Sequence, residues 1–480
     1  MATTLSPDDL AKTLAYLAPG QDALAKRYPG ESGKRQPVHT VYGGGHLFKA
    51  DTAPKLGVLA KKSLAEFAPN AFVFARAIGL PGHEHLPKAV NDARITLAEL
   101  EKNPSGVKAA NPHAWFAHTV YTRVVAKLER EPVEDFRIDF EDGYGNRPDA
   151  EEDGHVEAAA RELAKGAKEG TLPPFIGIRV KPYTRELAAR SIRTLDIFLT
   201  TLVEASGGKL PAGFVVTFPK IQFPEQVTAF VDVLDTLEAK LGLANGSVQI
   251  EIMVEQTQTI FTEDGKSALP LLHDAARGRL TGAHFGTYDY TASCSITAAH
   301  QHMTHPACDF ARHMMQVAFG GTGVFLSDGA TNVMPVGPHR VKGETKLSRE
   351  EELENRAAVH RAWHLHTAHI RHSLEHAFYQ GWDLHPAQLP TRYAAIITFF
   401  LEGLPPATER LKNFVDKAAQ ATLVGDVFDD AATGQGLLNF FLRGLSCGAL
   451  TEAEALATGL TVDEYRSRSF VKILENRRKR

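Results

Sequence analysis

Short apolar segments alternate with amphipathic helical patterns along most of this chain, and that alternation limits the possible folds more than any other feature. The apolar segments are rich in β-branched and aromatic residues, which is typical of strands. Near-continuous apolar strands separated by helices indicate a parallel sheet covered on its outer face. Eight such segments predict an α/β protein with a closed (β/α)₈ TIM barrel. They are residues 36–42, 135–140, 175–180, 214–218, 250–254, 282–286, 323–328 and 381–386.

The pattern divides the chain into three predicted parts. Residues 1–36 form a helical lead-in, in which Ser6 is the expected N-cap and Pro7 the first helical residue. Residues 37–390 form the barrel, with a long helical excursion between its first two strands. Only helical patterns follow, so residues 391–480 are predicted to form a C-terminal helical domain.

Composition excludes several classes of function. The net charge of −4 gives no footprint for a polyanion, so no nucleic-acid partner is expected. The three cysteines lack metal spacing and are too few for a disulfide framework, which fits a cytoplasmic protein. No apolar run approaches the roughly 18 residues needed to span a bilayer, so no membrane association is expected.

Two acidic residues directly follow consecutive predicted strands. Glu255 follows the strand 250–254, and Asp289 lies between two tyrosines just after the strand 282–286. In a barrel such residues share one mouth, where two carboxylates can converge on a hard cation such as Mg²⁺. The alternative is that each is an ordinary strand-end acid facing water.

Further charged residues follow the other strands. Asp139 and Glu141 follow the second strand, Arg179 the third and Lys220 the fourth, and His385 follows the eighth. Together they predict a metal site with a fixed cation beside it, suited to binding a small oxo-acid. Lys220 could instead form a Schiff base, although a structural or electrostatic role is favoured.

The ordered series of motifs resembles a known superfamily. The segments are RIDFEDGYG (137–145), GIRVKP (177–182), FPKI (218–221), MVEQT (253–257), FGTYDYTASCSI (285–296) and FDDAAT (428–433). They are similar to the strand-end series of the citrate lyase β-subunit, HpcH/HpaI aldolase and malate synthase superfamily. The last two segments resemble malate synthase most, with FDDAAT matching its C-terminal EDAAT or EDRAT segment.

This resemblance implies roles for individual residues. Glu255 and Asp289 would bind Mg²⁺, and Arg179 would hold the substrate carbonyl or carboxylate. Asp430 would be the catalytic base. Asp429 competes with it for this role, and the alternative role of Asp429 is to cap the following helix. Asp139, Glu141 and Lys220 would line the substrate site.

The resemblance also implies an activity. A malate-synthase-like condensation of acetyl-CoA with glyoxylate is the first expectation, and the substrates would be a small 2-oxo acid and an acyl-CoA. The alternative enzyme is an HpcH/HpaI-type aldolase or a citryl-CoA-lyase-like cleavage enzyme, and a non-catalytic binding protein on the same barrel is the third hypothesis. A homo-oligomer, trimeric or hexameric, is expected from the superfamily.

The chain departs from the malate synthase pattern at the sixth strand, where Gly286-Thr287-Tyr288 replaces Gly-Arg-Trp, and no segment independently signals CoA binding. Histidines gather in two places: His300, His302 and His305 lie close together, and others recur over residues 360–376. The first group could bind a metal, although a position on a loop or helix face is favoured, and the second is expected on a packed or solvated helix face.

Overall fold

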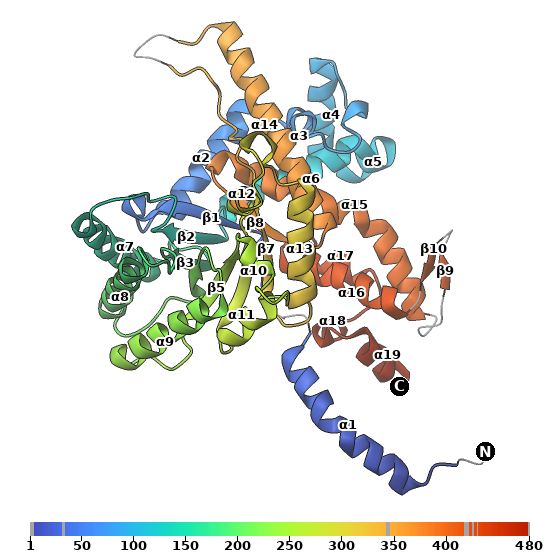
Figure 1. The fold of residues 1–480 in the computed structure, drawn as a ribbon. Coiled ribbons are helices and arrows are strands. Elements are labelled where there is room, and N and C mark those ends of the chain that lie inside the picture. Colours follow the sequence, from blue (N-terminus) through green and yellow to red (C-terminus); the bar gives the residue numbers. More distant parts are fainter. Residues whose placement is uncertain are drawn as a thin grey trace.

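Eight parallel strands close into a barrel in sequence order, which confirms the predicted fold (Figure 1). This computed structural model describes residues 4–30, 34–341, 346–416, 422–424, 427–429 and 431–478. The barrel closes where β1 pairs in parallel with β8. The strands are β1 (His39–Gly44), β2 (Asp135–Asp139), β3 (Phe175–Arg179), β4 (Phe214–Phe218), β5 (Gln249–Val254), β6 (Leu280–Phe285), β7 (Phe325–Ala330) and β8 (Gln380–Asp383).

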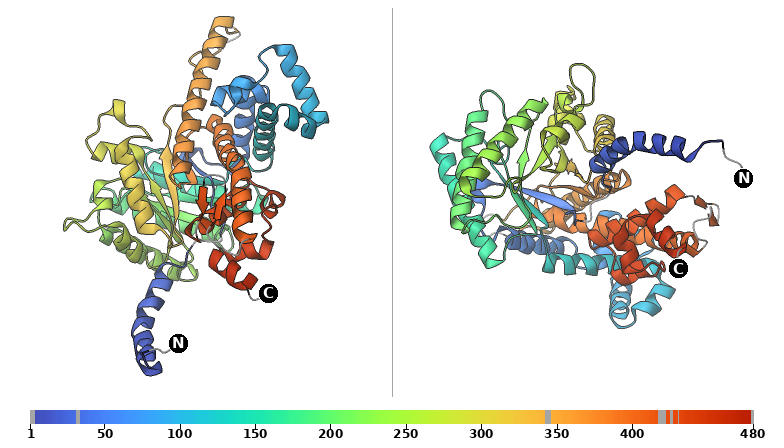
Figure 2. Two further views of the ribbon diagram at one scale, coloured as in Figure 1. Left: turned by 90° about the vertical axis from the view of Figure 1, so that its right-hand side faces the viewer. Right: turned by 90° about the horizontal axis from the view of Figure 1, so that it is seen from below.

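Helices surround the barrel and cover the outer faces of its strands (Figure 2). The longer ones are α7 (Asp149–Glu169), α8 (Ala188–Ala205), α9 (Pro224–Leu241), α13 (Pro306–Phe319), α14 (Arg349–Glu375) and α15 (Leu389–Asp416). Shorter helical segments in the connections are η1 (Gly45–Leu47), α10 (Thr257–Ile260), α11 (Leu269–Ala275), α12 (Thr287–Ser293), η3 (Ala298–His300) and η4 (Pro386–Gln388).

The excursion between β1 and β2 forms a layer of helices against α14 and α15. Phe74 packs edge-on against the buried Trp363 of α14, with ring centroids 5.6 Å apart. The Tyr393 hydroxyl of α15 donates a hydrogen bond to the carbonyl of Pro132, 3.0 Å away. This layer consists of α2 (Thr52–Phe67), α3 (Ala71–Ile78), η2 (His83–His85), α4 (Val90–Lys102), α5 (Pro104–Ala110) and α6 (Pro112–Arg130).

The first helix, α1 (Pro7–Arg27), extends away from the barrel as an arm (Figures 1 and 2). It starts as predicted: Ser6 caps the helix through a reciprocal pair of hydrogen bonds with Asp9, and Pro7 is its first residue. None of its residues is buried. Its attachment is at its end, where Arg27 pairs with Asp274 and the Gly30 amide donates to the Gly321 carbonyl at 2.9 Å.

After α15 the chain contains a short hairpin as well as helices, a difference from the all-helical prediction. β9 (Thr422–Val424) and β10 (Val427–Asp429) pair antiparallel, and their β-branched residues suit extended backbone. The helices that follow are α16 (Ala431–Ser446), α17 (Glu452–Leu456), α18 (Val462–Ser467) and α19 (Phe470–Arg478).

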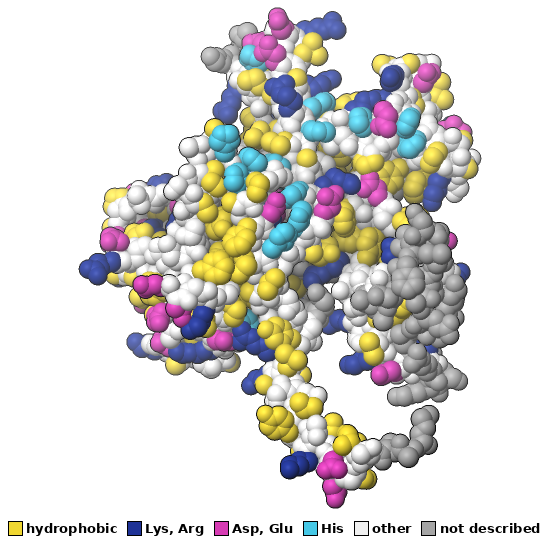
Figure 3. Space-filling model, turned by 45° about the vertical axis from the view of Figure 1, so that its right-hand side comes forward, with side chains coloured by type: hydrophobic (Ala, Val, Ile, Leu, Met, Phe, Trp, Pro, Cys, Tyr) yellow, Lys and Arg dark blue, Asp and Glu magenta, His cyan; other side chains and the backbone are white. Residues whose placement is uncertain are grey.

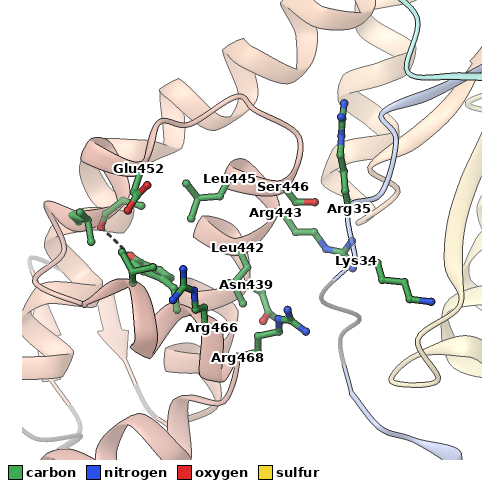
Figure 4. Close-up of a pocket in the computed structure, with 14 residues that line it drawn as sticks. Lys34, Arg35, Asn439, Leu442, Arg443, Leu445, Ser446, Glu452, Arg466 and Arg468 are labelled. Carbon is green, nitrogen blue, oxygen red and sulfur yellow. Dashed lines mark hydrogen bonds between the residues drawn. The ribbon is translucent and has the colours of Figure 1, made fainter. Parts of the chain in front are cut away.

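These C-terminal helices lie at the end of the barrel where the strands begin. Arg443 of α16 donates to the Gln36 side chain at 2.7 Å, and Gln36 in turn donates to Leu326 and Gln380, which are near the starts of β7 and β8. A cavity of about 380 Å³ lies between α16–α18 and residues 34 and 35, and Figure 4 shows Arg443 extending from α16 toward the segment that carries Lys34 and Arg35. This cavity is therefore at the end opposite to the strand-end carboxylates.

Candidate metal and substrate site

Strand register brings the predicted charged residues together at the barrel mouth. Asp139 is the last residue of β2 and Arg179 the last of β3, and the two are direct partners in the parallel ladder. Because side chains alternate along a strand, both point into the barrel together with Glu255, which directly follows β5. Asp139, Arg179 and Glu255 thus share one site.

Arg179 is held rigidly by two acids and two rings. Its Nε and Nη2 donate to the two carboxylate oxygens of Asp139 at 2.8 and 2.5 Å, and Nη1 lies 2.9 Å from Glu141 Oε2. The guanidinium lies over the rings of Tyr42 and Trp382, 4.8 and 5.9 Å from their centroids. A planar cation held along its edges by carboxylates and packed against two rings is suited to presenting a defined charge to a substrate oxygen.

Lys220 occupies the centre of the acidic side of the mouth. Its Nζ pairs with Glu141, lies 2.9 Å from Asp142 and lies 3.8 Å from Asp289. Although burial opposes it, the carboxylates of Glu141 and Glu255 raise the pKa of Lys220 above its usual value, so Nζ stays protonated. A protonated amine is not a nucleophile, which argues against the Schiff-base alternative.

The backbone of Lys220 also takes part in the site. Its φ of 51° is in the left-handed region, which non-glycine residues enter only at a cost of about 1–3 kcal/mol. In this conformation its amide donates to Glu255 Oε1 at 2.7 Å while its side chain turns toward Glu141. Lys220 therefore contacts Glu255 through its backbone and Glu141 through its side chain.

Glu255 and Asp289 lie among more negative charge than the nearby cations Lys220 and Arg179 offset. Glu255 is 1% exposed, and burial, followed by the negative charges of Glu141 and Asp289, raises its pKa to about 8. Burial also raises the pKa of Asp289. Both carboxylates are therefore held close to other acids without enough cations to neutralise them.

The charge balance and donor types fit a divalent cation. The carboxylates of Asp139, Glu141, Asp142, Glu255 and Asp289 carry five negative charges when ionised, and Arg179 and Lys220 carry two positive charges, which leaves three negative charges. All the candidate donors are oxygens, the ligands that Mg²⁺ prefers. The residues present thus fit the expected metal.

Gly286 is required for Glu255 to reach the mouth. A Cβ atom on Gly286 would lie 2.5 Å from both Cβ and Oε2 of Glu255. Only a residue without a side chain permits this approach. The glycine of FGTYDY therefore shapes the predicted metal site.

A layer of buried charge lies beneath the mouth, inside the barrel. Arg137 pairs with Asp135 and, through Nη2 at 2.7 Å, with Glu251. Glu251 also contacts His284 Nε2 at 3.0 Å, and the Trp382 indole donates to the other nitrogen of that ring at 3.0 Å. This network supports the floor of the mouth with fixed polar contacts.

Three residues near the site were not predicted from the sequence. Asp142 pairs with Lys220, and it could have been found because it directly follows Glu141 in the same acidic segment. Tyr42 and Trp382 stack on Arg179, and only the pairing of β1 with β2 and β8 brings them there. His385 was predicted to lie at the mouth, but it caps η4, where its Nδ1 accepts a hydrogen bond from the Ala387 amide at 3.1 Å.

The candidate base Asp430 lies outside the described residues, and nothing is described of the Asp429 side chain. The next helix, α16, starts beside the far end of α15: a Cβ on Gly434 would lie 2.8 Å from the Phe414 ring. α15 begins at Leu389, just after β8, and 25 residues of helix span about 38 Å. Within one chain, the start of α16 is thus far from Glu255 and Asp289.

A comparison with solved structures found several similar chains. A citrate lyase from Burkholderia xenovorans LB400 is 18% identical with a TM-score of 0.50, covering 71% of this chain and 92% of its own. CitE from Mycobacterium tuberculosis, in complex with magnesium, acetoacetate and coenzyme A, is 14% identical with a TM-score of 0.42 and coverages of 68% and 95%. A Haloferax volcanii malate synthase is 15% identical with a TM-score of 0.40 and coverages of 72% and 88%. The likeness to the citrate lyase shows that the two chains share the barrel fold.

The particular family is shown by sequence. The chain belongs to DUF6986, described as a domain of unknown function, whose family model matches residues 17–473. A search of curated proteins found no sequence match. Among the described residues, no helix has both the length and the apolar character that crossing a membrane would require.

Proposed function

We propose that this protein is a Mg²⁺-dependent enzyme that forms or cleaves a carbon–carbon bond of a small 2-oxo acid. The observation that carries the proposal is the mouth itself, where five carboxylates surround two fixed cations and Glu255 has a pKa raised to about 8. Such an uncompensated cluster calls for a further cation. The favoured reaction is a malate-synthase-like condensation of acetyl-CoA with glyoxylate.

The proposed roles follow from the geometry. Glu255 and Asp289 would hold Mg²⁺, which when bound supplies a Lewis acid for a substrate oxygen. Arg179 would stabilise the negative charge that develops on the 2-oxo-acid oxygen, because Asp139 fixes its guanidinium in one orientation. Lys220 would pair with Glu141 and Asp142 and hold both carboxylates in place at the edge of the substrate site.

The condensation also needs a base that removes an α-proton from the acyl thioester. Asp430 is the proposed base, and the position of α16 at the opposite end of its own barrel leads us to propose that it serves the mouth of a neighbouring copy. This proposal requires a homo-oligomer, for which a trimer or hexamer is the expectation.

A second candidate function is cleavage by an HpcH/HpaI-type aldolase or a citryl-CoA-lyase-like enzyme. The position of α16 favours it. Within a single chain, Arg179 and the carboxylates that would hold the metal lie at the mouth, but the start of α16, which Asp430 directly precedes, lies far from them. Cleavage of a hydroxyacyl-CoA gives an acyl-CoA and a 2-oxo acid and releases no thiol, whereas the condensation consumes water and releases free CoA.

A substrate panel with Mg²⁺ tests these candidates. The mixtures are glyoxylate with acetyl-CoA, glyoxylate with propionyl-CoA, glyoxylate alone, and a hydroxyacyl-CoA alone. Release of free thiol and formation of a 2-oxo acid are measured in each. Thiol release that requires both substrates supports the condensation. Cleavage of a hydroxyacyl-CoA without thiol release supports the second candidate, and inactivity in every mixture would contradict both.

The variant Asp430→Asn tests the proposed base. We expect it to keep Mg²⁺ binding but to lose exchange of the acyl methyl protons with deuterated solvent, by about 10²–10⁴-fold in rate. Mixing Asp430→Asn with Glu255→Gln chains provides the control for action between copies. Mixed oligomers should regain part of the activity, and exchange at the normal rate by Asp430→Asn alone would rule out the base.

A further inference from the structure

A second group of potential metal ligands lies on the outside of the barrel, between α13 and α14. Asp309 is in the first turn of α13, and His372 and His376 are one turn apart at the end of α14. One ligand atom from each residue lies within 4.8 Å of the other two. Figure 3 shows histidine side chains gathered beside acidic ones on the face that it presents.

The ring of His376 is oriented as a metal ligand would be. Its Nδ1 lies 2.8 Å from the backbone carbonyl of His372, and since a carbonyl can only accept, Nδ1 donates. The neutral ring then carries its lone pair on Nε2. Metal-binding histidines are usually held in this way, with the other ring nitrogen donating to a carbonyl or carboxylate.

His372 makes contacts that it cannot satisfy together. Its Nε2 lies 2.8 Å from the carboxylate of Asp309 and 3.1 Å from Nη2 of Arg312. The first contact requires a donor and the second an acceptor, and one neutral ring nitrogen cannot be both. A cation shared by His372 and Asp309 would remove the conflict, because Arg312 already pairs directly with Asp309.

Arg312 and its partners hold Asp309 in place, and the guanidinium lies beside the same Asp309 oxygen that His372 contacts. Arg312 is fully buried, and its Nη1 lies 3.0 Å from the buried carboxylate of Asp328 on β7. Asp328 also accepts from the Ser373 hydroxyl at 2.6 Å, which connects it to α14. The single positive charge of Arg312 offsets only one of the two carboxylates, Asp309 and Asp328. These three residues therefore retain one negative charge that can attract a cation.

We propose that Asp309, His372 and His376 bind a single divalent transition-metal ion of the Zn²⁺ class. Two imidazoles and one carboxylate are ligands that Zn²⁺ takes, and they differ from the all-oxygen donors of the barrel mouth. Ligand atoms about 2.0–2.2 Å from a tetrahedral ion are about 3.4 Å apart, so small side-chain rotations bring these three within range. Water, or His313 with its ring centroid 5.7 Å from that of His376, completes the coordination.

The position of this site indicates its role. It joins α13 to the C-terminal end of α14, the two outer helices that flank β7 in the chain. The bound ion therefore ties these helices together, away from the strand-end carboxylates. The site does not depend on the proposed function, since none of its ligands is at the mouth.

Calorimetric titration of the full-length protein with Zn²⁺ tests the proposal, with millimolar Mg²⁺ present to occupy the mouth. We expect one ion per chain, and His376→Gln should weaken binding by more than the 10–100-fold typical of losing an outer partner. His364→Gln is the matched control, because His364 is exposed on the same helix outside the group. Co²⁺ in place of Zn²⁺ should give the visible absorption of a four-coordinate site in the wild type and the control.

Unchanged Zn²⁺ affinity and stoichiometry in His376→Gln would overturn the proposal, as would equal weakening by His364→Gln. Circular dichroism checks that each variant is folded. If His376→Gln does not fold, Asp309→Asn, which keeps the size of the side chain, takes its place with the same expected loss. Binding of several ions per chain with no dependence on either residue would identify an adventitious ion only.

Discussion

Replacing Glu255 with glutamine should make the metal-free protein more stable at high pH, which is the reverse of what loss of a paired charge does. Glu255 is fully buried, and burial, then the charges of Glu141 and Asp289, raises its pKa from 4.5 to about 8. The folded protein thus keeps a proton that the unfolded chain releases. Folded-state stability therefore falls as the pH rises from about 4.5 to about 8, and no such penalty exists below this window.

The size of the effect follows from the pKa. At about 1.4 kcal/mol for each pH unit, the rise from 4.5 to about 8 corresponds to at most about 5 kcal/mol. Because Glu141 and Asp289 share the repulsion and can take up part of the proton, about 2–5 kcal/mol is expected at pH 9. Glutamine keeps the oxygen that accepts the Lys220 amide, so this hydrogen bond of 2.7 Å can persist.

The assay is denaturant unfolding of wild type and Glu255→Gln near pH 5 and pH 9, with a chelator and then with Mg²⁺. Glu186→Gln, on an exposed residue, is the control for a general change of charge. We expect the free energy of unfolding of Glu255→Gln to exceed that of the wild type only at pH 9 without Mg²⁺. Adding Mg²⁺ should raise the stability of the wild type but not that of the variant. The same pH trend in all three proteins would refute the assignment of Glu255.

Three further predictions concern the same end of the barrel. Arg179→Lys should lower kcat/KM by about 10²–10³ although it keeps the charge, because an ammonium cannot reproduce the fixed planar fork, and steady-state kinetics on the active substrate pair will show it. Gly286→Ala should abolish Mg²⁺ binding, measured by calorimetry, because the added Cβ displaces Glu255. Gly154→Ala is the control, since Gly154 lies inside α7 with open space around an added Cβ. It should bind Mg²⁺ normally, and its free energy of unfolding should rise by about 0.5–1 kcal/mol. Arg137→Met should lower the free energy of unfolding by about 3–5 kcal/mol, measured by denaturant titration, because it removes the arginine with which two buried carboxylates pair.

The polar interior of the barrel was present in the sequence but was not predicted. β2 alternates Asp135, Arg137 and Asp139 with two apolar residues, and in β5 Glu251 lies between two isoleucines. A period of two places these charges on one face of each strand, which is the face inside the barrel. The strands were instead interpreted as nearly continuous apolar segments, and the charge network beneath the mouth was missed.

The sequence alone determined the architecture and most of the charged residues at the mouth. Strand and helix periodicity is local, so eight strands and their order could be predicted, and the rule that parallel strands end on one side brought together Asp139, Arg179 and Glu255. The C-terminal helices were also predicted, but not the end of the barrel on which they pack.

Tertiary structure decided which partners these residues have. The stacking of Tyr42 and Trp382 on Arg179 depends on closure of the barrel between β1 and β8, residues far apart in the sequence. The Asp309–His372 contact likewise depends on how two outer helices pack. Periodicity fixes which face a side chain occupies, whereas the distance between two faces is set by packing of the whole chain, and charges and metal ligands act only through that distance.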